Sequence, residues 1–514
     1  MTTQHCMDLL NSIRSSAGKA RTRGLGDEAV RKFLETDKDL ARAIEAAAAN
    51  RGKASPAEDK LFKMEEKALC LLLQEQILNF YPAAGINPYA PLAAAGSWIV
   101  TSHGAVLHDS GGYGMLGMGH APLGVLAAMS EPYVMANVMT PSFSQRRLTE
   151  RLSREIGRSR GSCPFEKFVF LNSGSESVTF ACRVADIHAR TMTEPGGRQA
   201  GKKVMRLAVV EGFHGRTEGP ARSSHSCRAN YAKHLASYRD ADNLLFVPIN
   251  DLGALRRAFA DAEKNGVFFE AFFVEPVMGE GIPGLALTRE YYDEARALTL
   301  KTGTLLLVDS IQAALRAQAC LSIVDYAGFE TCVPPDMETF SKALNAGQYP
   351  LSVTALSGAV AAQYVTGLYG NTMTGNPRAM EVACAVLDST TEAVRANIRE
   401  RGLEFIAKFK ELAVEFPGAV EQVVGTGLMV SAMLNPKRYR VQGEGGFEEF
   451  MRVNGIEMIH GGECGLRFTP SFGITSAEID IIVSVMRRGL KELAAPVKAG
   501  GPAAGKKKAE KKVR

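Results

Sequence analysis

Asp309 and Lys342, thirty-three positions apart, are the residues of this chain whose types and settings most directly suggest chemistry. Asp309 ends an apolar run, residues 304–308, that has the length of a buried strand. A carboxylate at the carboxyl end of such a strand is where open α/β sheets contact ligands. Lys342 follows a proline-rich turn at residues 333–336 and lies between small and apolar neighbours. A lysine in that setting loses its proton more easily than one in water and can act as an amine nucleophile.

Together the two residues match what pyridoxal phosphate (PLP) requires of a protein. The cofactor needs a lysine to form a Schiff base and an acid that keeps its pyridine nitrogen protonated. Each residue also has an ordinary structural interpretation, because strand-end aspartates often cap helices and lysines after turns are often solvated surface charges. The pair alone therefore leaves PLP binding as one possibility. The elements that position the two residues must distinguish it from the structural interpretations.

A candidate phosphate site lies earlier in the chain. Residues 168–171 predict a buried strand, and the small polar turn at residues 172–177 leads into a predicted helix that ends near Arg190. The N–H groups and the dipole at the start of such a helix form an anion site. A plain capping box, with Ser173 as the cap and Glu176 three residues later, explains the same residues equally well.

The alternation of strand, polar turn and helix recurs along the middle of the chain. Apolar runs at residues 207–210 and 271–274 end in the polar segments 211–217 and 275–281. This pattern is typical of a parallel, doubly wound sheet with its site along one edge. We therefore predict an α/β fold with a large doubly wound mixed or parallel sheet and a smaller α+β domain.

The patterns divide the chain into five parts. Before residue 96 the sequence is helical in character, with a break where Ser55 can cap a helix and Pro56 suits its first position. Packing or subunit contact is the expected role of this part. The predicted parts are an N-terminal helical extension (1–95), the N-terminal part of a small domain (96–160), a large PLP-binding domain (161–385), the C-terminal part of the small domain (386–493) and a disordered basic tail (494–514).

Composition excludes several classes of protein. Hydrophobic residues make up 46% and charged residues 22% of the chain, as in soluble globular proteins, and no apolar run approaches the roughly 20 residues that span a bilayer. The nine cysteines contain no Cys-x-x-Cys pair, which favours free thiols in a reducing compartment over a metal site or disulfides. The tail carries a net charge of +6 and leaves −1 for the rest. We therefore expect a cytoplasmic protein with no metal, no membrane contact and no nucleic-acid partner.

In their order and approximate spacing, these segments resemble the class III PLP-dependent aminotransferases, the ornithine, GABA and lysine ω-aminotransferases. The resemblance covers about residues 96–490. It implies the PLP-dependent transferase fold of type I and PLP as the cofactor. It also implies a homodimer or higher homo-oligomer, because Thr372 matches a threonine that completes the phosphate site of the neighbouring subunit.

The resemblance implies roles for individual cofactor-site residues. Lys342 would bond PLP, Asp309 would keep the ring nitrogen protonated, and Gln312 would reach the ring hydroxyl. Gly174 and Ser175 would cradle the phosphate through their N–H groups. Lys342 and Asp309 would thus be catalytic, and the expected cofactor-binding residues are Ser173, Gly174, Ser175, Phe213, His214, Glu275, Asp309, Gln312, Lys342 and Thr372.

The same resemblance implies how substrates would bind. Tyr113 matches the aromatic position of a substrate loop, and Arg216 matches an arginine that binds a substrate carboxylate with its two-pronged guanidinium. Arg467 matches the arginine for the α-carboxylate of 2-oxoglutarate or glutamate. Glu280 matches the acid that covers this arginine when an ω-amino substrate is bound. An ordinary structural ion pair is the alternative interpretation of Glu280 and Arg467.

Several loops depart from the family pattern. Ser310 stands where the family usually has glutamate, Met278 stands where it usually has glutamine, and residues 313–318 and 343–348 differ from the usual glycine-rich segments. The cofactor residues are thus retained, while the loops that shape the substrate pocket have drifted.

Three functions agree with these features. The leading hypothesis is transamination of a small amine or ω-amino acid, such as lysine, ornithine or GABA, with a 2-oxo acid acceptor such as 2-oxoglutarate. The first alternative is a PLP-dependent aminomutase or racemase on the same scaffold. The second, which the drifted loops motivate, is a non-catalytic PLP-binding dimer.

Overall fold

A seven-stranded mixed sheet forms the centre of the molecule in the computed structural model, which describes residues 2–135, 139–239 and 243–494. The strand order is β4-β10-β9-β8-β7-β5-β6, and β10 runs antiparallel to both of its neighbours while β9, β8, β7, β5 and β6 are parallel. The strands are β4 (Lys167–Leu171), β5 (Lys203–Val209), β6 (Leu244–Val247), β7 (Val267–Val274), β8 (Leu305–Asp309), β9 (Met337–Phe340) and β10 (Ser352–Leu356).

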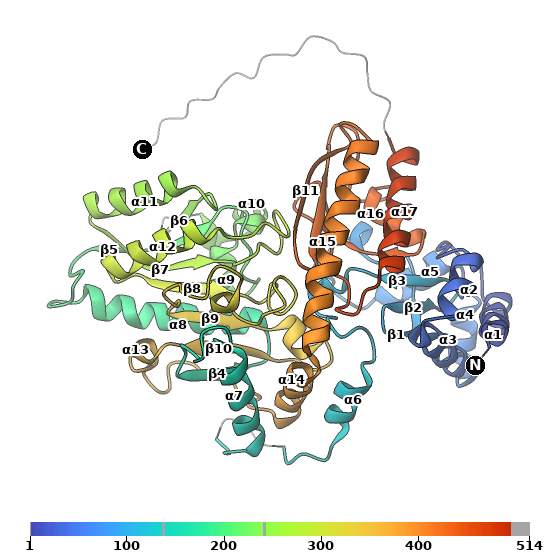
Figure 1. Ribbon diagram of the computed structural model, residues 1–514, viewed down its shortest axis with the longest axis horizontal. Coiled ribbons are helices and arrows are strands. Elements are labelled where there is room, and N and C mark those ends of the chain that lie inside the picture. Colours follow the sequence, from blue (N-terminus) through green and yellow to red (C-terminus); the bar gives the residue numbers. More distant parts are fainter. Residues whose placement is uncertain (1, 136–138, 240–242, 495–514) are drawn as a thin grey trace, which may run out of the picture.

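Helices cover both faces of this sheet (Figure 1). Phe273 and Leu307 pack in a cluster with α8 (Gly174–Thr193), whereas the alternate residues Phe272 and Leu306 belong to the larger core that includes α11 (Leu252–Lys264) and α12 (Arg289–Thr302). Side chains of a strand alternate between faces, so these strands are apolar on both sides. The remaining helices around the sheet are α6 (Leu123–Ser130), α7 (Phe143–Glu155), α9 (Glu218–Ser223), α10 (Arg228–His234), α13 (Gly358–Ala361) and α14 (Pro377–Ser389).

Two four-stranded sheets lie beside the central one. The first has the order β11-β12-β15-β14 and the second the order β1-β2-β3-β13, in which β13 joins β3 in parallel. This pairing brings the segment after residue 96 against the C-terminal segment. The elements are β1 (Pro91–Ala95), β2 (Trp98–Thr101), β3 (Val106–Asp109), α15 (Glu392–Glu415), β11 (Val420–Thr426), β12 (Met429–Leu434), α16 (Phe447–Val453), β13 (Ile456–Glu457), β14 (Ile459–Gly461), β15 (Gly465–Phe468) and α17 (Ser476–Glu492).

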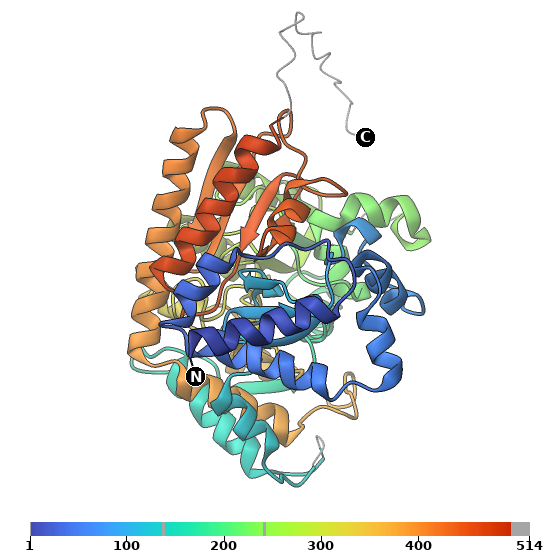
Figure 2. The same cartoon turned by 90° about the vertical axis from the view of Figure 1, so that its right-hand side faces the viewer.

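The N-terminal segment forms five helices that pack beside this part of the molecule (Figure 2). They are α1 (Thr3–Ser16), α2 (Asp27–Leu34), α3 (Lys38–Gly52), α4 (Pro56–Phe62) and α5 (Glu66–Gln74). Ser55 forms the expected cap of α4, with Pro56 in its first turn. The helical pattern after Pro56 is interrupted before Glu66, whose buried carboxylate accepts hydrogen bonds from the backbone N–H groups of Arg21 and Thr22 at 2.8 and 2.6 Å. A tertiary contact thus overrides local helix propensity.

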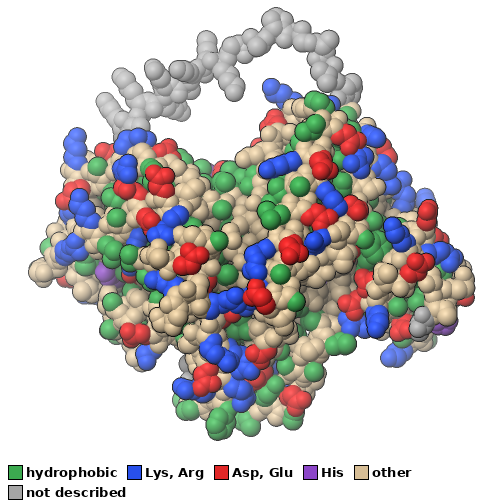
Figure 3. Space-filling model, in the orientation of Figure 1, with side chains coloured by type: hydrophobic (Ala, Val, Ile, Leu, Met, Phe, Trp, Pro, Cys, Tyr) green, Lys and Arg blue, Asp and Glu red, His purple; other side chains and the backbone are tan. Residues whose placement is uncertain are grey.

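The surface carries mixed charge, with basic and acidic side chains interspersed on the face shown in Figure 3. Within the described ranges, no helix has the length and apolarity needed to cross a membrane. The predicted basic tail lies outside the described residues apart from its first position, Ala494. The limits assigned to the other four parts stay predictions.

Candidate active site

A cavity of about 930 Å³ lies at the carboxyl ends of β5, β7 and β8. Parallel strands end at the same edge of a sheet, and ligands of open α/β folds bind there. Phe213 and Glu275 follow β5 and β7, Asp309 ends β8, and all three line the cavity. Of the predicted site residues, the cavity is lined by Ser173, Gly174, Ser175, Phe213, His214, Arg216, Glu275, Glu280, Asp309, Gln312, Lys342 and Arg467.

Asp309 is the last residue of β8 and is 3% exposed. Its Oδ1 accepts hydrogen bonds from Thr339 Oγ1 at 3.0 Å and from the Ile311 N–H at 3.2 Å. Its Oδ2 lies 2.8 Å from His214 Nδ1, which can donate. These contacts fix the orientation of a carboxylate that would be costly to bury without partners.

Lys342 follows the end of β9, begins a short 3-10 helix, Lys342–Asn345, and lines the same cavity. Its backbone has φ +48°, a left-handed conformation that costs a non-glycine residue roughly 1–3 kcal/mol and is typical of functional positions. Its Nζ donates to Gln312 Oε1. Burial, followed by the positive charge of Arg467, lowers the pKa of Lys342 to about 8, so a larger share of this amine is neutral near physiological pH.

The start of α8 faces the same cavity. Ser173 caps the helix by accepting from the Glu176 N–H at 3.3 Å. The Glu176 carboxylate accepts from the Asn172 N–H at 2.7 Å and not from the cap residue, so the reciprocal capping box is not formed. Ser175 Oγ accepts from the N–H groups of Arg216 and Thr217 at 3.1 and 3.2 Å, which holds the loop after β5 against the helix start. A helix start with this geometry suits an anion.

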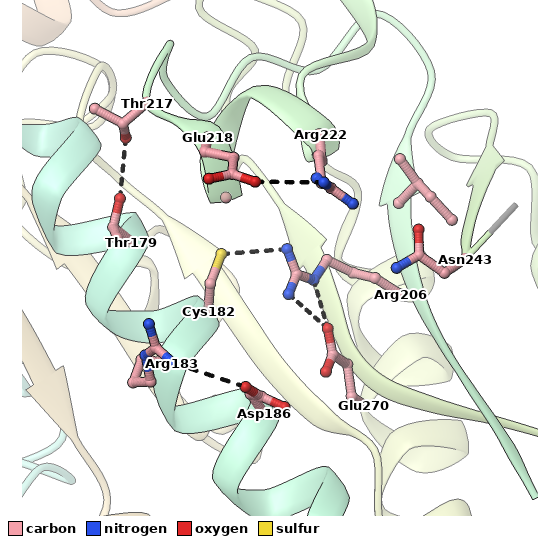
Figure 4. Close-up of a pocket in the computed structure, with 12 residues that line it drawn as sticks. Thr179, Cys182, Arg183, Asp186, Arg206, Thr217, Glu218, Arg222, Asn243 and Glu270 are labelled. Atoms are coloured by element: carbon pink, nitrogen blue, oxygen red, sulfur yellow. Dashed lines mark hydrogen bonds and ion pairs between the residues drawn. The ribbon is translucent and has the colours of Figure 1, made fainter. Parts of the chain in front are cut away.

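A second cavity of about 420 Å³ lies behind the helix start (Figure 4). Thr217 lines both cavities, and its hydroxyl lies 2.8 Å from Ser175 Oγ and 2.9 Å from Thr179 Oγ1. Each arginine that lines this second cavity is paired with a carboxylate: Arg183 with Asp186, Arg206 with Glu270 and Arg222 with Glu218. These charges balance, so the arginines of the second cavity do not form a site for an anion. The link from this cavity to the first one is the contact between the hydroxyl groups of Thr179, Thr217 and Ser175.

Two further carboxylates border the first cavity. Glu280 and Arg467 form an ion pair at 2.9 Å, and the guanidinium also donates to the Gly279 carbonyl. Glu275 accepts from the N–H groups of Phe213 and Gly279, each at 2.9 Å, and burial raises its pKa to about 7. Glu275 thus ties the loop after β5 to the loop that carries Glu280.

Two predicted residues are not placed in the cavity. Thr372 is exposed in the segment after α13 and does not line the cavity of its own chain. The side chain of Tyr113 lies outside the described residues. The roles assigned to all predicted site residues stay predictions.

Sequence reasoning missed residues that the fold brings to the cavity from far away. Asn79, Phe80 and Tyr81 line it, although they follow the N-terminal helices and no pattern in them indicates chemistry. The buried acid that accompanies Ser310 was also missed: Glu338 on β9 accepts from the Ser310 hydroxyl, and burial raises the pKa of Glu338 to about 7. A buried carboxylate thus lies beside position 310, on the adjacent strand.

Comparisons with known proteins agree with this fold. The sequence profile of the family described as Aminotransferase class-III matches residues 82–490. Ornithine aminotransferase of Bordetella pertussis is 28% identical over 430 residues, which cover 81% of this chain and 96% of that protein. Acetylornithine aminotransferase of Thermosynechococcus vestitus is 29% identical over 334 residues, covering 64% and 76%. The structure of ornithine aminotransferase from Toxoplasma gondii matches with a TM-score of 0.70 at 21% identity, covering 85% of this chain and 99% of that one.

Proposed function

The chain belongs to the class III aminotransferases, whose cofactor is PLP, and from this premise we propose that it transfers the amino group of an ω-amino acid to a 2-oxo acid such as 2-oxoglutarate. The observation that carries the proposal is one cavity that holds a lysine of lowered pKa, a buried acid and two arginines: Lys342, Asp309, Arg216 and Arg467. The names of the relatives, ornithine and acetylornithine aminotransferases, support an ω-amino donor.

The residues of the cavity fit PLP. Asp309 is a buried acid for the ring nitrogen, Lys342 is an amine for the aldehyde, and the start of α8 suits the phosphate. Gly174 leaves room there, because a Cβ on it would lie 2.8 Å from the Ile311 side chain. When bound, PLP supplies an electron sink for charge at the substrate carbon and carries the amino group between the two substrates.

Lys342 is the proposed acid and base. Its Nζ is oriented by Gln312 Oε1 and has a pKa of about 8, close to the operating pH, which suits a group that must both accept and donate a proton. Asp309 and its partners provide a fixed negative charge that needs no rearrangement during the reaction.

Glu280 and Arg467 support the use of two substrates that differ in charge. Glu280 pairs with Arg467 at 2.9 Å and neutralises its charge. This state suits an ω-amino donor, because a donor that reacts at its ω-amino group places no carboxylate beside Arg467. A 2-oxo acid would displace Glu280 and form a two-pronged pair with the guanidinium. Arg216 remains for the carboxylate at the other end of the donor.

We also propose that the active enzyme is at least a homodimer. Thr372 lies outside the cavity of its own chain, in an exposed segment beside the exposed apolar side chains of Leu368 and Met373. A second copy that covers this surface would bring Thr372 to a neighbouring phosphate site.

A donor panel tests the proposed reaction. We expect one of ornithine, N-acetylornithine, lysine or GABA to bleach the visible absorption band of the PLP-loaded protein, because transfer of the amine converts the cofactor to its amino form. Addition of 2-oxoglutarate should restore the band and produce glutamate. Spectra recorded before and after each addition, with product analysis, make the measurement.

The opposite results are equally clear. A band that none of these donors bleaches contradicts transamination of ω-amino acids. A donor that is isomerised without any 2-oxo acid would instead favour an aminomutase or racemase. Bleaching by a donor that only pyruvate reverses would overturn 2-oxoglutarate as the acceptor.

The lowered pKa of Lys342 predicts how cofactor capture depends on pH. Only the neutral amine attacks the aldehyde, so the capture rate of the cofactor-free protein should rise about tenfold per pH unit below pH 8 and level off above it. Stopped-flow absorbance measures this rate. Arg467→Gln should move the midpoint of this pH dependence to higher pH, because it removes a positive charge that disfavours protonation of Lys342. A wild-type rate that still rises tenfold per unit near pH 10 contradicts the assignment.

A further inference from the structure

Three aromatic rings surround the guanidinium of Arg216. Its Cζ lies 5.3 Å from the ring centroid of Phe80, 5.9 Å from that of Tyr81 and 5.4 Å from that of Phe213. Its Nη1 also donates to Cys227 Sγ at 3.5 Å. Stacked or facing rings attract a guanidinium through their π electrons and leave its in-plane N–H groups available to a carboxylate.

Two of these rings come from outside the part of the chain that matches the family. Phe80 and Tyr81 lie just before residue 82, where the match begins, in the segment that joins α5 to β1. We call residues 75–82 the strap. The segment that follows the N-terminal helices thus forms part of a wall of the active-site cavity.

The strap is anchored at both ends. Before it, the buried Glu66 binds the backbone of the N-terminal segment. After it, the Gly85 carbonyl accepts from Arg452 Nη1 at 3.0 Å, and Tyr89 donates to Glu457 Oε2 at 2.8 Å. Within it, Asn79 Oδ1 accepts from the Tyr81 N–H at 2.9 Å. These contacts hold the rings beside Arg216.

We propose that Phe80 is a positioning residue, which holds the Arg216 guanidinium in the orientation that binds the carboxylate of the amine donor. The strap is then the element that gives this enzyme its preference for donors with a carboxylate at the end of a short methylene chain. The inference rests on the role proposed for Arg216. It assigns to the N-terminal extension a function in substrate selection.

The chemistry of the wall agrees with such a donor. The rings of Phe80 and Phe213 line the cavity beside the guanidinium and offer apolar surface to the methylene groups of such a donor. Phe80 is 73% exposed, so its substitution removes a contact with Arg216 and little of the core. A cation–π contact at an exposed site contributes on the order of a two- to five-fold change in affinity.

Valerate, a carboxylate without an amine, probes Arg216 without any turnover. Phe80→Leu keeps an apolar side chain but removes the ring. Calorimetry on the PLP-loaded protein should then show a dissociation constant for valerate that is roughly two- to five-fold larger than in the wild type. The KM for δ-aminovalerate should rise by the same factor, with the loss in KM rather than kcat. Phe80→Tyr should restore both values, and Leu78→Ala, an exposed change in the same strap, should leave both unchanged.

A double-mutant cycle decides the matter. In the Arg216→Gln background, Phe80→Leu should have no further effect on valerate binding, because the ring acts through the guanidinium. Two results would overturn the inference, even if the enzyme turned over every donor of the panel. One is an equal effect of Phe80→Leu on valerate binding in both backgrounds, and the other is wild-type valerate affinity in Phe80→Leu. If no amine donor reacts yet the cycle shows coupling, the positioning of Arg216 by Phe80 for a carboxylate stands and the proposed transamination falls.

Discussion

Replacement of Lys342 with alanine is expected to lower the rate of amino transfer by at least about a thousand-fold. The change removes the amine that is proposed to bond the cofactor and to move the proton at the substrate carbon; acid–base catalysis alone contributes roughly 10²–10⁴-fold. No other lysine lines the cavity among the described residues, so no nearby amine can substitute. Single-turnover absorbance with the best donor of the panel measures the effect.

Two comparisons make this result specific. Lys410→Ala, at an exposed position on α15, should retain full activity. Lys342→Arg should be as inactive as the alanine variant, because a guanidinium stays protonated and cannot form the covalent bond. Turnover within tenfold of wild type in Lys342→Ala would contradict the central assignment. A cellular role that survived the loss of turnover would favour the non-catalytic dimer.

The residues proposed for the cofactor site could be selected from the sequence because they lie on local patterns. Asp309 ends an apolar run, Ser173 begins a helix after another, and both features follow from strand and helix physics. Their meeting in one cavity follows from the topology of a parallel sheet, which gathers the carboxyl ends of its strands. The class III family and its α/β fold were therefore accessible from the sequence, and the family match over residues 82–490 confirms them.

The strap was not accessible in the same way. Phe80 and Tyr81 reach Arg216 because of tertiary contacts made by Glu66, Arg452 and Tyr89, and none of these has a local signature. Helix α5 ends at Gln74, and the chain then turns toward the cavity, which Asn79, Phe80 and Tyr81 line.

The contact between Ser310 and Glu338 illustrates a second limit. Position 310 departs from the family pattern, but nothing in the sequence indicates that a buried carboxylate lies beside it. Glu338 pairs with Val308 in the register of β8 and β9, so its side chain reaches the Ser310 hydroxyl across the sheet. Such a contact depends on strand order and register, which one sequence does not determine.

Asp309→Asn is expected to lower kcat by about a hundred- to a thousand-fold, the loss typical when one preorganised electrostatic group is removed from an active site. The shape of the site should survive. Thr339 Oγ1 lies 3.0 Å from the Asp309 carboxylate and can still donate to the amide oxygen of the asparagine. The amide nitrogen can donate to His214 Nδ1. The histidine then holds its proton on Nε2, which is buried and has no partner among the described residues.

The comparison that separates charge from geometry is Thr339→Val, which removes one hydrogen bond to Asp309 and leaves its charge. A single hydrogen bond contributes about 0.5–1.5 kcal/mol, so this variant should lose at most roughly tenfold in kcat. Steady-state kinetics of both variants, with cofactor content measured in each, give the two values. If Asp309→Asn stayed within tenfold of wild type, the negative charge at the end of β8 would not be what stabilises the reaction. The hydrogen-bonded shape shared by Thr339, Asp309 and His214 would then explain the site.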